Sequence, residues 1–426
     1  MQEKLLHFIW QNLLFTTNEL KSTDNETLQI LSKGTLNAHA GPDFTNAKIM
    51  IGDIVWVGNV EIHIKSGDWK LHGHTKDPGY DNTILHVCWE YNEPIFRTDN
   101  SRISCLALKP VTDNTLLHRY AQLMESANDI PCSPRISSIS PFTWSLWLER
   151  LVVERLEQKT AIIYEALEQT KYEWQEVFYR FIARNFGLKI NTQPFENLAR
   201  NLPLAILSKH KDSLKQIEAL VFGVAGFLND ELIDEYGRNR QKEYRFLKKK
   251  YNLIEIDKTQ WKFLRLMPAN FPTVRLAQFA SLIHHSNNLF SKLVSTPSIH
   301  SLCDLLSTSP SDYWKTHYLL DHLSTHREKR LGESTIQNII INTVIPFKFA
   351  FGKHKHDESI QQNAFDLLEQ VKPENNSIIK KWKDLGFKAE NSLQSQALLQ
   401  LKNEYCISKR CLDCNIGYKL LKNEAD

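Results

Sequence analysis

Residues 41–87 read GPDFTNAKIMIGDIVWVGNVEIHIKSGDWKLHGHTKDPGYDNTILHV. Two segments rich in apolar and β-branched residues, 47–51 and 54–65, lie on either side of Gly52-Asp53. This arrangement is typical of a β-hairpin with a two-residue turn. A third segment of the same kind follows at 83–90. The stretch therefore predicts the centre of a β-sheet.

The flanking sequence extends this sheet and then changes character. Residues 1–15 carry an apolar stripe with helical spacing, and 27–31 and 103–109 have the composition of short strands. From Pro141 onward the apolar spacing is helical, with further helices expected at 173–185, 203–228, 230–251, 274–293, 310–323, 334–351, 358–370 and 392–403. We expect an α+β protein: a mixed α/β domain with a hairpin-centred sheet at 1–115, a connector at 116–140, and a large all-α domain at 141–426.

The composition indicates an ordinary globular protein with several cores. The 426 residues are 42% hydrophobic and carry a net charge of +3, which neither requires nor excludes a nucleic-acid partner. No apolar run approaches the length of a membrane span, and no cleavage site follows the apolar N-terminus. Seven cysteines without a secretion signal favour a cytoplasmic location. The oligomeric state stays open.

Two carboxylates and two basic groups form the first candidate site. With a turn at Gly52-Asp53, Asp43 falls opposite Ile62, one position from Glu61; a bulge at Gly58-Asn59 would shift this register by one. Glu61, His63 and Lys65 share one face of the second strand. Asp43 and Glu61 could hold Mg²⁺ or Mn²⁺, with His63 or Lys65 assisting water. The alternative is a hairpin with one solvated, charged face.

Histidines form the second candidate site. His63, His72, His74 and His86 lie within one short stretch. Imidazoles suit Zn, Mn, Fe or Ni better than Mg, so a transition-metal site is the second hypothesis. Together with Asp43 and Glu61, these four are the candidate metal ligands. Each histidine could instead be an ordinary hydrogen-bonded side chain.

Cysteines form the third candidate site. Cys406, Cys411 and Cys414 follow a ligand-like spacing near the C-terminus, and Cys132, in the connector, is the best fourth ligand, with Cys303 in reserve. Four thiolates suit zinc or an iron–sulfur cluster. Three unligated thiols packed beneath a terminal helix are the alternative.

Two resemblances add to these patterns. The order of helix, strand, Pro42-Asp43, hairpin and Glu61-x-His63 resembles the PD-(D/E)XK nuclease superfamily, which would assign metal binding to Asp43 and Glu61. His63 replaces the usual lysine of that motif, and Lys65 could substitute for it. The segments GPDF, GNVEIH, DWKLHGHTKDPGY, IPC, FPTVRLAQFA and CLDCNIG resemble an uncharacterised bacterial family of the DUF2851 type, frequent in Bacteroidetes, which implies no activity. The cysteine arrangement is similar to the iron–sulfur staple of some helicase-associated nucleases, although its spacings differ.

The functional hypotheses follow from these sites. The first is a metal-dependent nuclease-like hydrolase acting on nucleic acid. A histidine-rich metal enzyme with another substrate and a non-catalytic scaffold with structural metal are the alternatives. In the helical part, Arg275 and Gln278 lie one turn apart where a phosphate could bind, and the basic segments 245–250 and 353–356 could contact nucleic acid, although solvated helix faces would look the same. Motifs of nucleotide hydrolysis and of common serine hydrolases are absent from the sequence.

Overall fold

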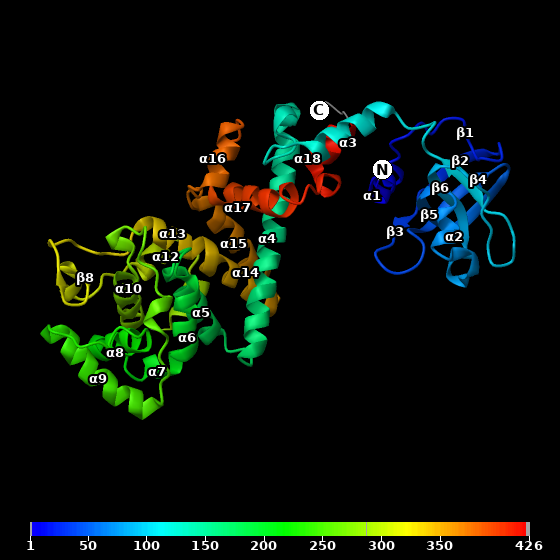
Figure 1. Ribbon diagram of the computed structural model, residues 1–426. Coiled ribbons are helices and arrows are strands. Elements are labelled where there is room, and N and C mark those ends of the chain that lie inside the picture. Colours follow the sequence, from blue (N-terminus) through cyan, green and yellow to red (C-terminus); the bar gives the residue numbers. More distant parts are fainter. Residues whose placement is uncertain (1, 287, 423–426) are drawn as a thin grey trace. The chain divides into compact units, whose positions relative to one another are not determined.

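The computed structural model describes residues 2–286 and 288–422. The chain forms two compact units, which Figure 1 shows as a ribbon. The sheet unit comprises residues 1–147 and 402–426, and the helical unit comprises residues 148–401. The α+β fold class is confirmed. The units divide differently from the predicted boundaries at 115 and 141, because the C-terminal segment belongs to the sheet unit.

One seven-stranded sheet dominates the described part of the sheet unit, with β3 attached to β4 and the other strands in the order β1-β2-β4-β5-β6-β7. Strands β2, β4 and β5 form an antiparallel meander, and β5, β6 and β7 are parallel. The bounds are β1 Leu20–Lys21, β2 Thr27–Ser32, β3 Thr35–Leu36, β4 Phe44–Ile51, β5 Ile54–Lys65, β6 Thr83–Glu90 and β7 Ser104–Ala107. All the strands predicted from the sequence are present.

Short helices link β5 to β6, as a parallel pair requires a crossover. They are α2 Asp68–Leu71, η1 His74–Lys76 and η2 Pro78–Tyr80. Helix α1 (Glu3–Gln11) contributes Leu5, Leu6 and Ile9 to a core shared with Val60 and Ile62 of β5. One face of β5 therefore packs on α1, which leaves the Glu61 and His63 side chains on the other face.

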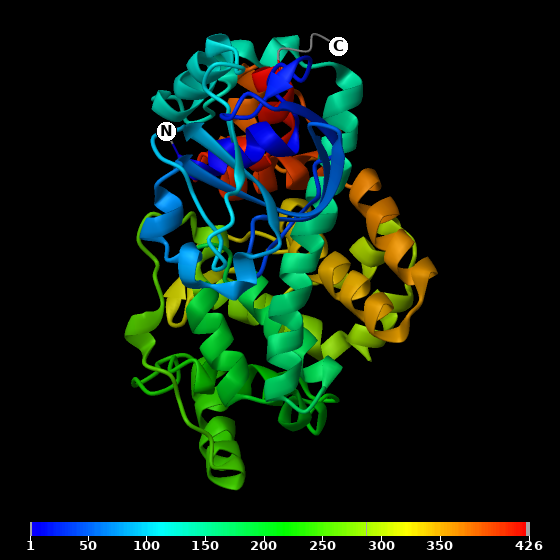
Figure 2. The ribbon, with the colours of Figure 1, turned by 90° about the vertical axis from the view of Figure 1, so that its right-hand side faces the viewer.

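The C-terminal segment packs on this core. It contains a π-helical turn η8 (Leu401–Cys406), a 3₁₀ turn η9 (Cys411–Asp413) and α18 (Asn415–Lys422). Cys411 and Leu421 are buried in the same cluster as the α1 residues, and Phe8 and Tyr418 form an edge-to-face pair. Figure 2 shows this red segment against the dark-blue α1. Helix α3 (Asn114–Glu125), next to α18, occupies part of the predicted connector, and η3 (Ser133–Ser138) follows it.

The helical unit is built on paired helices around an aromatic core. Phe178, Phe186, Phe195, Phe222, Phe279 and Phe347 are fully buried there. Helix α4 (Pro141–Gln169) begins in the sheet unit and continues into this one. The other elements are α5 Trp174–Phe186, α6 Thr192–Asn201, α7 Leu204–Ser208, α8 Leu214–Val224, α9 Glu235–Tyr251, η4 Lys258–Gln260, η5 Pro268–Asn270, α10 Pro272–His285, α11 Leu289–Ser295, α12 Ile299–Leu306, η6 Asp312–Lys315, β8 His317–Leu319, β9 His322–Leu323, α13 Glu333–Ile339, η7 Ile340–Val344, α14 Ile345–Lys355, α15 Glu358–Gln370, α16 Ser377–Asp384 and α17 Ser392–Gln400.

One predicted helix is wrong. Residues 310–323 form the short η6 turn and a small hairpin of β8 and β9 instead. Asp321 explains the difference, because it has a left-handed backbone (φ 60°) and its carboxylate accepts hydrogen bonds from the distant Ile233 and Asp234 N–H groups. A left-handed residue cannot continue an α-helix. The predicted helices at 203–228 and 274–293 are each split in two.

Helices long and apolar enough to cross a membrane do not occur in the described residues.

Candidate metal and carboxylate site

The site lies on β5, and the hairpin register places its carboxylates. Gly52 has a left-handed backbone (φ 61°), as the first position of a type II′ turn requires, and Ile51 pairs with Ile54. The predicted register holds as far as the pair Ala47–Gly58 and then shifts, so that Phe44 pairs with Val60. The extra residue lies on β4, where Asn46 is left-handed (φ 57°), rather than at Gly58-Asn59. Asp43 thus moves to the level of Glu61.

Asp43 and Glu61 lie side by side, and a backbone N–H group of the opposite segment donates to each carboxylate. The Asp43 N–H donates to Glu61 Oε2 at 2.9 Å, and Asp43 Oδ2 accepts from the Ile62 N–H at 2.9 Å. His7 of α1 adds a contact to the same aspartate, with Nε2 3.3 Å from Oδ2. The two carboxylates predicted to meet are therefore adjacent, and each has one oxygen engaged by the backbone.

Three imidazoles converge beside Glu61. One ligand atom from each of His63, His72 and His74 lies within 4.8 Å of the others, and theirs is the single group of this kind among the described residues. His63 Nε2 is 3.0 Å from His72 Nδ1. Glu61 Oε1 is 3.7 Å from His63 Nε2 and 3.4 Å from His74 Nε2. These spacings are those of donors grouped around one ion whose bonds are about 2 Å long.

His74 carries an unsatisfied buried nitrogen. Its Nε2 is buried and has no hydrogen-bond partner among the described residues, although Glu61 Oε1 is only 3.4 Å away. The ring itself is fixed by stacking on Tyr80, with centroids 3.7 Å apart. A buried nitrogen of this kind is costly unless it binds something. His74 Nε2 is thus available to a ligand or to a hydrogen-bond partner.

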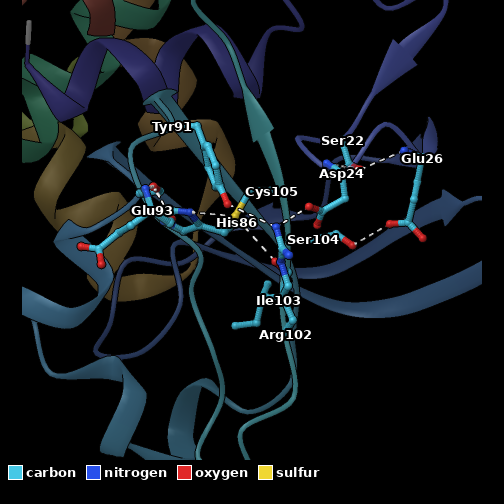
Figure 3. Close-up of polar contacts among 11 residues, drawn as sticks. Ser22, Asp24, Glu26, His86, Tyr91, Glu93, Arg102, Ile103, Ser104 and Cys105 are labelled. Carbon is cyan, nitrogen blue, oxygen red and sulfur yellow. Dashed lines mark hydrogen bonds and ion pairs between the residues drawn. The ribbon is translucent and has the colours of Figure 1, made fainter.

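His86 lies behind the cluster and orients His63. Its Nε2 is 2.8 Å from His63 Nδ1. Figure 3 shows His86 next to Cys105, whose thiol donates to the Ile103 carbonyl at 3.6 Å and lies 3.8 Å from His86 Nδ1. A thiol that donates to Ile103 leaves its sulfur to accept from His86 Nδ1–H, so that His86 Nε2 accepts from His63 Nδ1–H. This tautomer chain directs the lone pair of His63 Nε2 toward His72 and His74.

Burial favours the uncharged forms of Glu61, His63, His74 and His86. Burial and then the charge of Asp43 raise the pKa of Glu61 to about 8. Burial and the neighbouring His72 and His74 lower the pKa of His63 to about 4. Burial and His72 also lower the pKa of His74, and burial, His63 and His74 lower the pKa of His86. Neutral imidazoles have the free lone pair that metal binding needs. Glu61, in turn, is a desolvated acid with no cationic partner among the described residues.

Lys65 is the remaining predicted residue of the β5 face. Lys65 is exposed, and its backbone N–H donates to Asp68 at the start of α2. Asp77 caps η2 by accepting from Gly79. Sequence reasoning missed Glu3 and His7 of α1, although their i, i+4 spacing in an apolar helix is a signal that could have been found. The pKa of Glu3 is raised by burial and by Asp43, which places Glu3 near the same acidic group.

The cysteines form a separate group in the sheet unit. Cys406, Cys411 and Cys414 are buried, Cys132 is half-buried, and all four are free thiols. Burial raises the pKa of Cys132 and Cys411 to about 12 and that of Cys414 to about 11, and neighbouring thiols add to the shift at Cys132 and Cys411. The four sulfurs thus occupy one region, as predicted, but they are not gathered within the span of a single ion. The reserve candidate Cys303 belongs to α12 of the helical unit.

The chain was compared with known proteins. Neither the curated proteins nor the solved structures include a match. A family model described as "Protein of unknown function (DUF2851)" matches residues 3–377, which include every histidine and carboxylate of the candidate site and Cys132 but not the three C-terminal cysteines. Because this match covers most of the sequence, the chain belongs to the DUF2851 family.

Proposed function

We propose that the sheet unit is a metal-dependent hydrolase whose ion is held by His63, His72 and His74. The observation that carries the proposal is the convergence of these three imidazoles beside Glu61, with His74 Nε2 buried and without a hydrogen bond among the described residues. Three imidazoles favour zinc or another late first-row ion over magnesium. Asp43 lies next to this site and is not one of the proposed ligands, because one of its oxygens already accepts a hydrogen bond from the Ile62 N–H.

Glu61 is the residue proposed to act on water. It lies 3.4–3.7 Å from two of the imidazole nitrogens, so it borders the ion site without belonging to the three-histidine group. A bound ion would supply an acidified water, and sites with three protein ligands leave a position open for it. A carboxylate whose pKa lies near the working pH is suited to general base catalysis. His72 is exposed, which gives solvent and substrate access to the site.

The proposed substrate is a phosphodiester of nucleic acid. The resemblance to the PD-(D/E)XK nucleases rests on the order of α1, β2, Pro42-Asp43 and the β4–β5 hairpin that carries Glu61 and His63. Asp43 next to Glu61 matches the residue pair of that resemblance. The proposed substrate is therefore supported by the order of the elements and motifs along the chain. The proposed metal is supported by the positions of the imidazole nitrogens.

A structural metal site is the second candidate. Glu61 could complete a closed four-ligand set with the three histidines, and structural zinc sites have such sets. Burial of His63 and His86 inside the unit favours this possibility. The two candidates predict different effects of the same substitution at Glu61.

The test is cleavage of end-labelled single- and double-stranded DNA and RNA by the full chain, reconstituted separately with Zn²⁺, Mn²⁺ and Mg²⁺. We expect cleavage with at least one ion, its loss in the His72→Ala and His74→Ala variants, and in Glu61→Gln a loss of cleavage with the metal retained. Loss of the metal itself in Glu61→Gln would favour the structural site. No cleavage of any substrate by metal-loaded protein would contradict the nuclease proposal.

We also propose a metal group at the four cysteines. Three of the four thiols are buried. Neighbouring thiols raise the pKa values of Cys132 and Cys411, so Cys132 lies near the C-terminal cysteines although it is far from them in the sequence. Four thiolates suit an iron–sulfur cluster, and zinc is the alternative.

A further inference from the structure

A polar cavity lies in the helical unit, apart from the metal and cysteine groups of the sheet unit. Its volume is about 380 Å³, and its lining includes Asn270, Arg275, Thr335, Asn338, Lys372 and Asn376. Arg275 and Thr335 lie in the first turns of α10 and α13, Asn338 lies near the end of α13, and Asn376 directly precedes α16. The volume is within the range of small-molecule sites. The lining is rich in amides, which can both donate and accept hydrogen bonds.

The cavity contains a buried guanidinium. Arg275, in the first turns of α10, is only 6% exposed. Its Nη1 donates to Gln278 Oε1 at 3.2 Å, and its Nη2 donates to Asn270 Oδ1 at 2.6 Å and to Thr335 Oγ1 at 3.1 Å. Nε has no partner among the described residues. An arginine has five N–H donors, so these three bonds leave part of the fork free.

All three acceptors of Arg275 are neutral. Burial lowers the pKa of the guanidinium to about 10, and a carboxylate does not contribute to the shift. Glu374, an acid of the lining, accepts a hydrogen bond from the neutral Gln396, and Glu333 of α13, outside the lining, pairs with Lys372 at 3.6 Å. A buried cation without a carboxylate is costly, because desolvation is not repaid by an opposite charge. This charge is the strongest unexplained feature of the unit.

We propose that the cavity binds the oxyanion group of a small organic anion, a phosphate or a carboxylate, on Arg275. A guanidinium matches both groups in geometry and charge. The N-terminal end of α10 adds favourable potential, whereas Lys372 of the lining is paired with Glu333. The surrounding amides would contact the polar remainder of the ligand. This inference does not depend on the hydrolase proposal, since the cavity lies wholly within the helical unit.

The experiment titrates the full chain, freed of metal with EDTA, with inorganic phosphate and separately with acetate. Binding is followed by calorimetry and by the rise in unfolding temperature that a ligand of the native state produces. We expect one of the two anions to bind, and the stronger one identifies the class of ligand. Arg275→Gln should abolish the binding, and His74→Ala should leave it unchanged, which separates this site from the sheet unit.

A second variant tests the proposal even if Arg275→Gln does not fold. Asn338→Asp adds a negative charge at an exposed position of the lining and keeps the acceptor that Asn342 Nδ2 uses at 3.0 Å. It should weaken anion binding about tenfold or more, since a like charge would lie in the same cavity. Asn338→Gln, and Lys249→Gln on the exposed face of α9, should have little effect. Absence of binding of both anions, or equal binding by all the variants, would overturn the proposal.

Discussion

Asp43 and Glu61 are adjacent where β4 meets β5: the Asp43 N–H donates to Glu61 Oε2, and Asp43 Oδ2 accepts from the N–H of Ile62, the residue after Glu61, both at 2.9 Å. This arrangement fixes the glutamate beside three imidazoles and gives it a like-charged neighbour. The pKa of about 8 follows from that position and from burial. The candidate site is therefore a consequence of strand register, and its properties can be tested residue by residue.

The support that His86 gives to His63 predicts an effect on metal affinity. His86→Ala removes the partner of His63 Nδ1, which lies 2.8 Å from His86 Nε2, without removing a proposed ligand. Outer partners of ligating histidines typically contribute 10–100-fold in affinity, so a loss of about that size is expected. Competition with a chromophoric zinc chelator measures it. Thr83→Ser, on the same strand, is the control; equal affinities of His86→Ala and wild type would exclude the orienting role.

Stability should fall with pH in the metal-free protein. A glutamate whose folded pKa is about 8 binds its proton more tightly in the folded than in the unfolded state, so folding loses stability as the pH rises toward 8. The histidines act oppositely, but only below their ordinary pKa of 6.5. Between pH 6.5 and 8 we expect a loss of about 2 kcal/mol.

Glu61→Gln is the control for this pH dependence. The variant lacks the titrating carboxyl, so its stability should be nearly flat over the same interval. Denaturant unfolding in EDTA, followed by hydrogen exchange of peptides from β4 to β6, measures the stability of the sheet unit itself. An equal slope in both proteins would assign the pH dependence to other groups.

Replacing a side chain by alanine should have different effects on stability at the two ends of β5. Ile62 is fully buried beneath α1, whereas Val57 is 63% exposed near the hairpin turn. Ile62→Ala should destabilise the sheet unit by roughly 2–5 kcal/mol, since it leaves a cavity in the core. Val57→Ala should change stability by no more than about 0.5 kcal/mol. Hydrogen exchange of strand peptides provides the comparison; similar effects at both positions would contradict the assigned faces of β5.

The cysteine proposal predicts a coloured protein. Protein purified without oxygen should contain iron and acid-labile sulfide and absorb in the visible region, and Cys132→Ser should lose most of both. Cys303→Ser, in the helical unit, should keep them. Zinc without iron would show that the cysteines hold a single zinc ion rather than an iron–sulfur cluster. The same metal content in Cys132→Ser would exclude Cys132 as a ligand.

Local patterns made most of the sheet unit predictable. The turn at Gly52-Asp53 and the alternation of β5 were sufficient to place Glu61 and His63 on one face, because strand periodicity is a local property. The one-residue shift in β4 was anticipated as a possibility but assigned to the wrong strand. Gly58 serves another purpose: a side chain there would collide with the Asn82 carbonyl and with Ile84.

The remaining features depend on contacts between residues far apart in the sequence, which limited what the sequence could predict. The return of Cys411 and Leu421 to the core of α1 depends on packing between the two ends of the chain, which periodicity does not encode. The helix expected at 310–323 failed for the same reason, since Asp321 is fixed by contacts with Ile233 and Asp234 far away in sequence. His7 was overlooked because α1 was interpreted only through its apolar stripe.

The most direct test of the account is the binding of one divalent transition-metal ion to the full chain. Calorimetry with Zn²⁺ and elemental analysis after dialysis should give one tightly bound ion in addition to any metal at the cysteines. The variant His72→Ala/His74→Ala should lose that ion while keeping the fold, and His118→Ala, on α3, should retain it. Unchanged zinc binding in the double variant, or no binding in the wild type outside the cysteines, would contradict a metal centre at His63, His72 and His74.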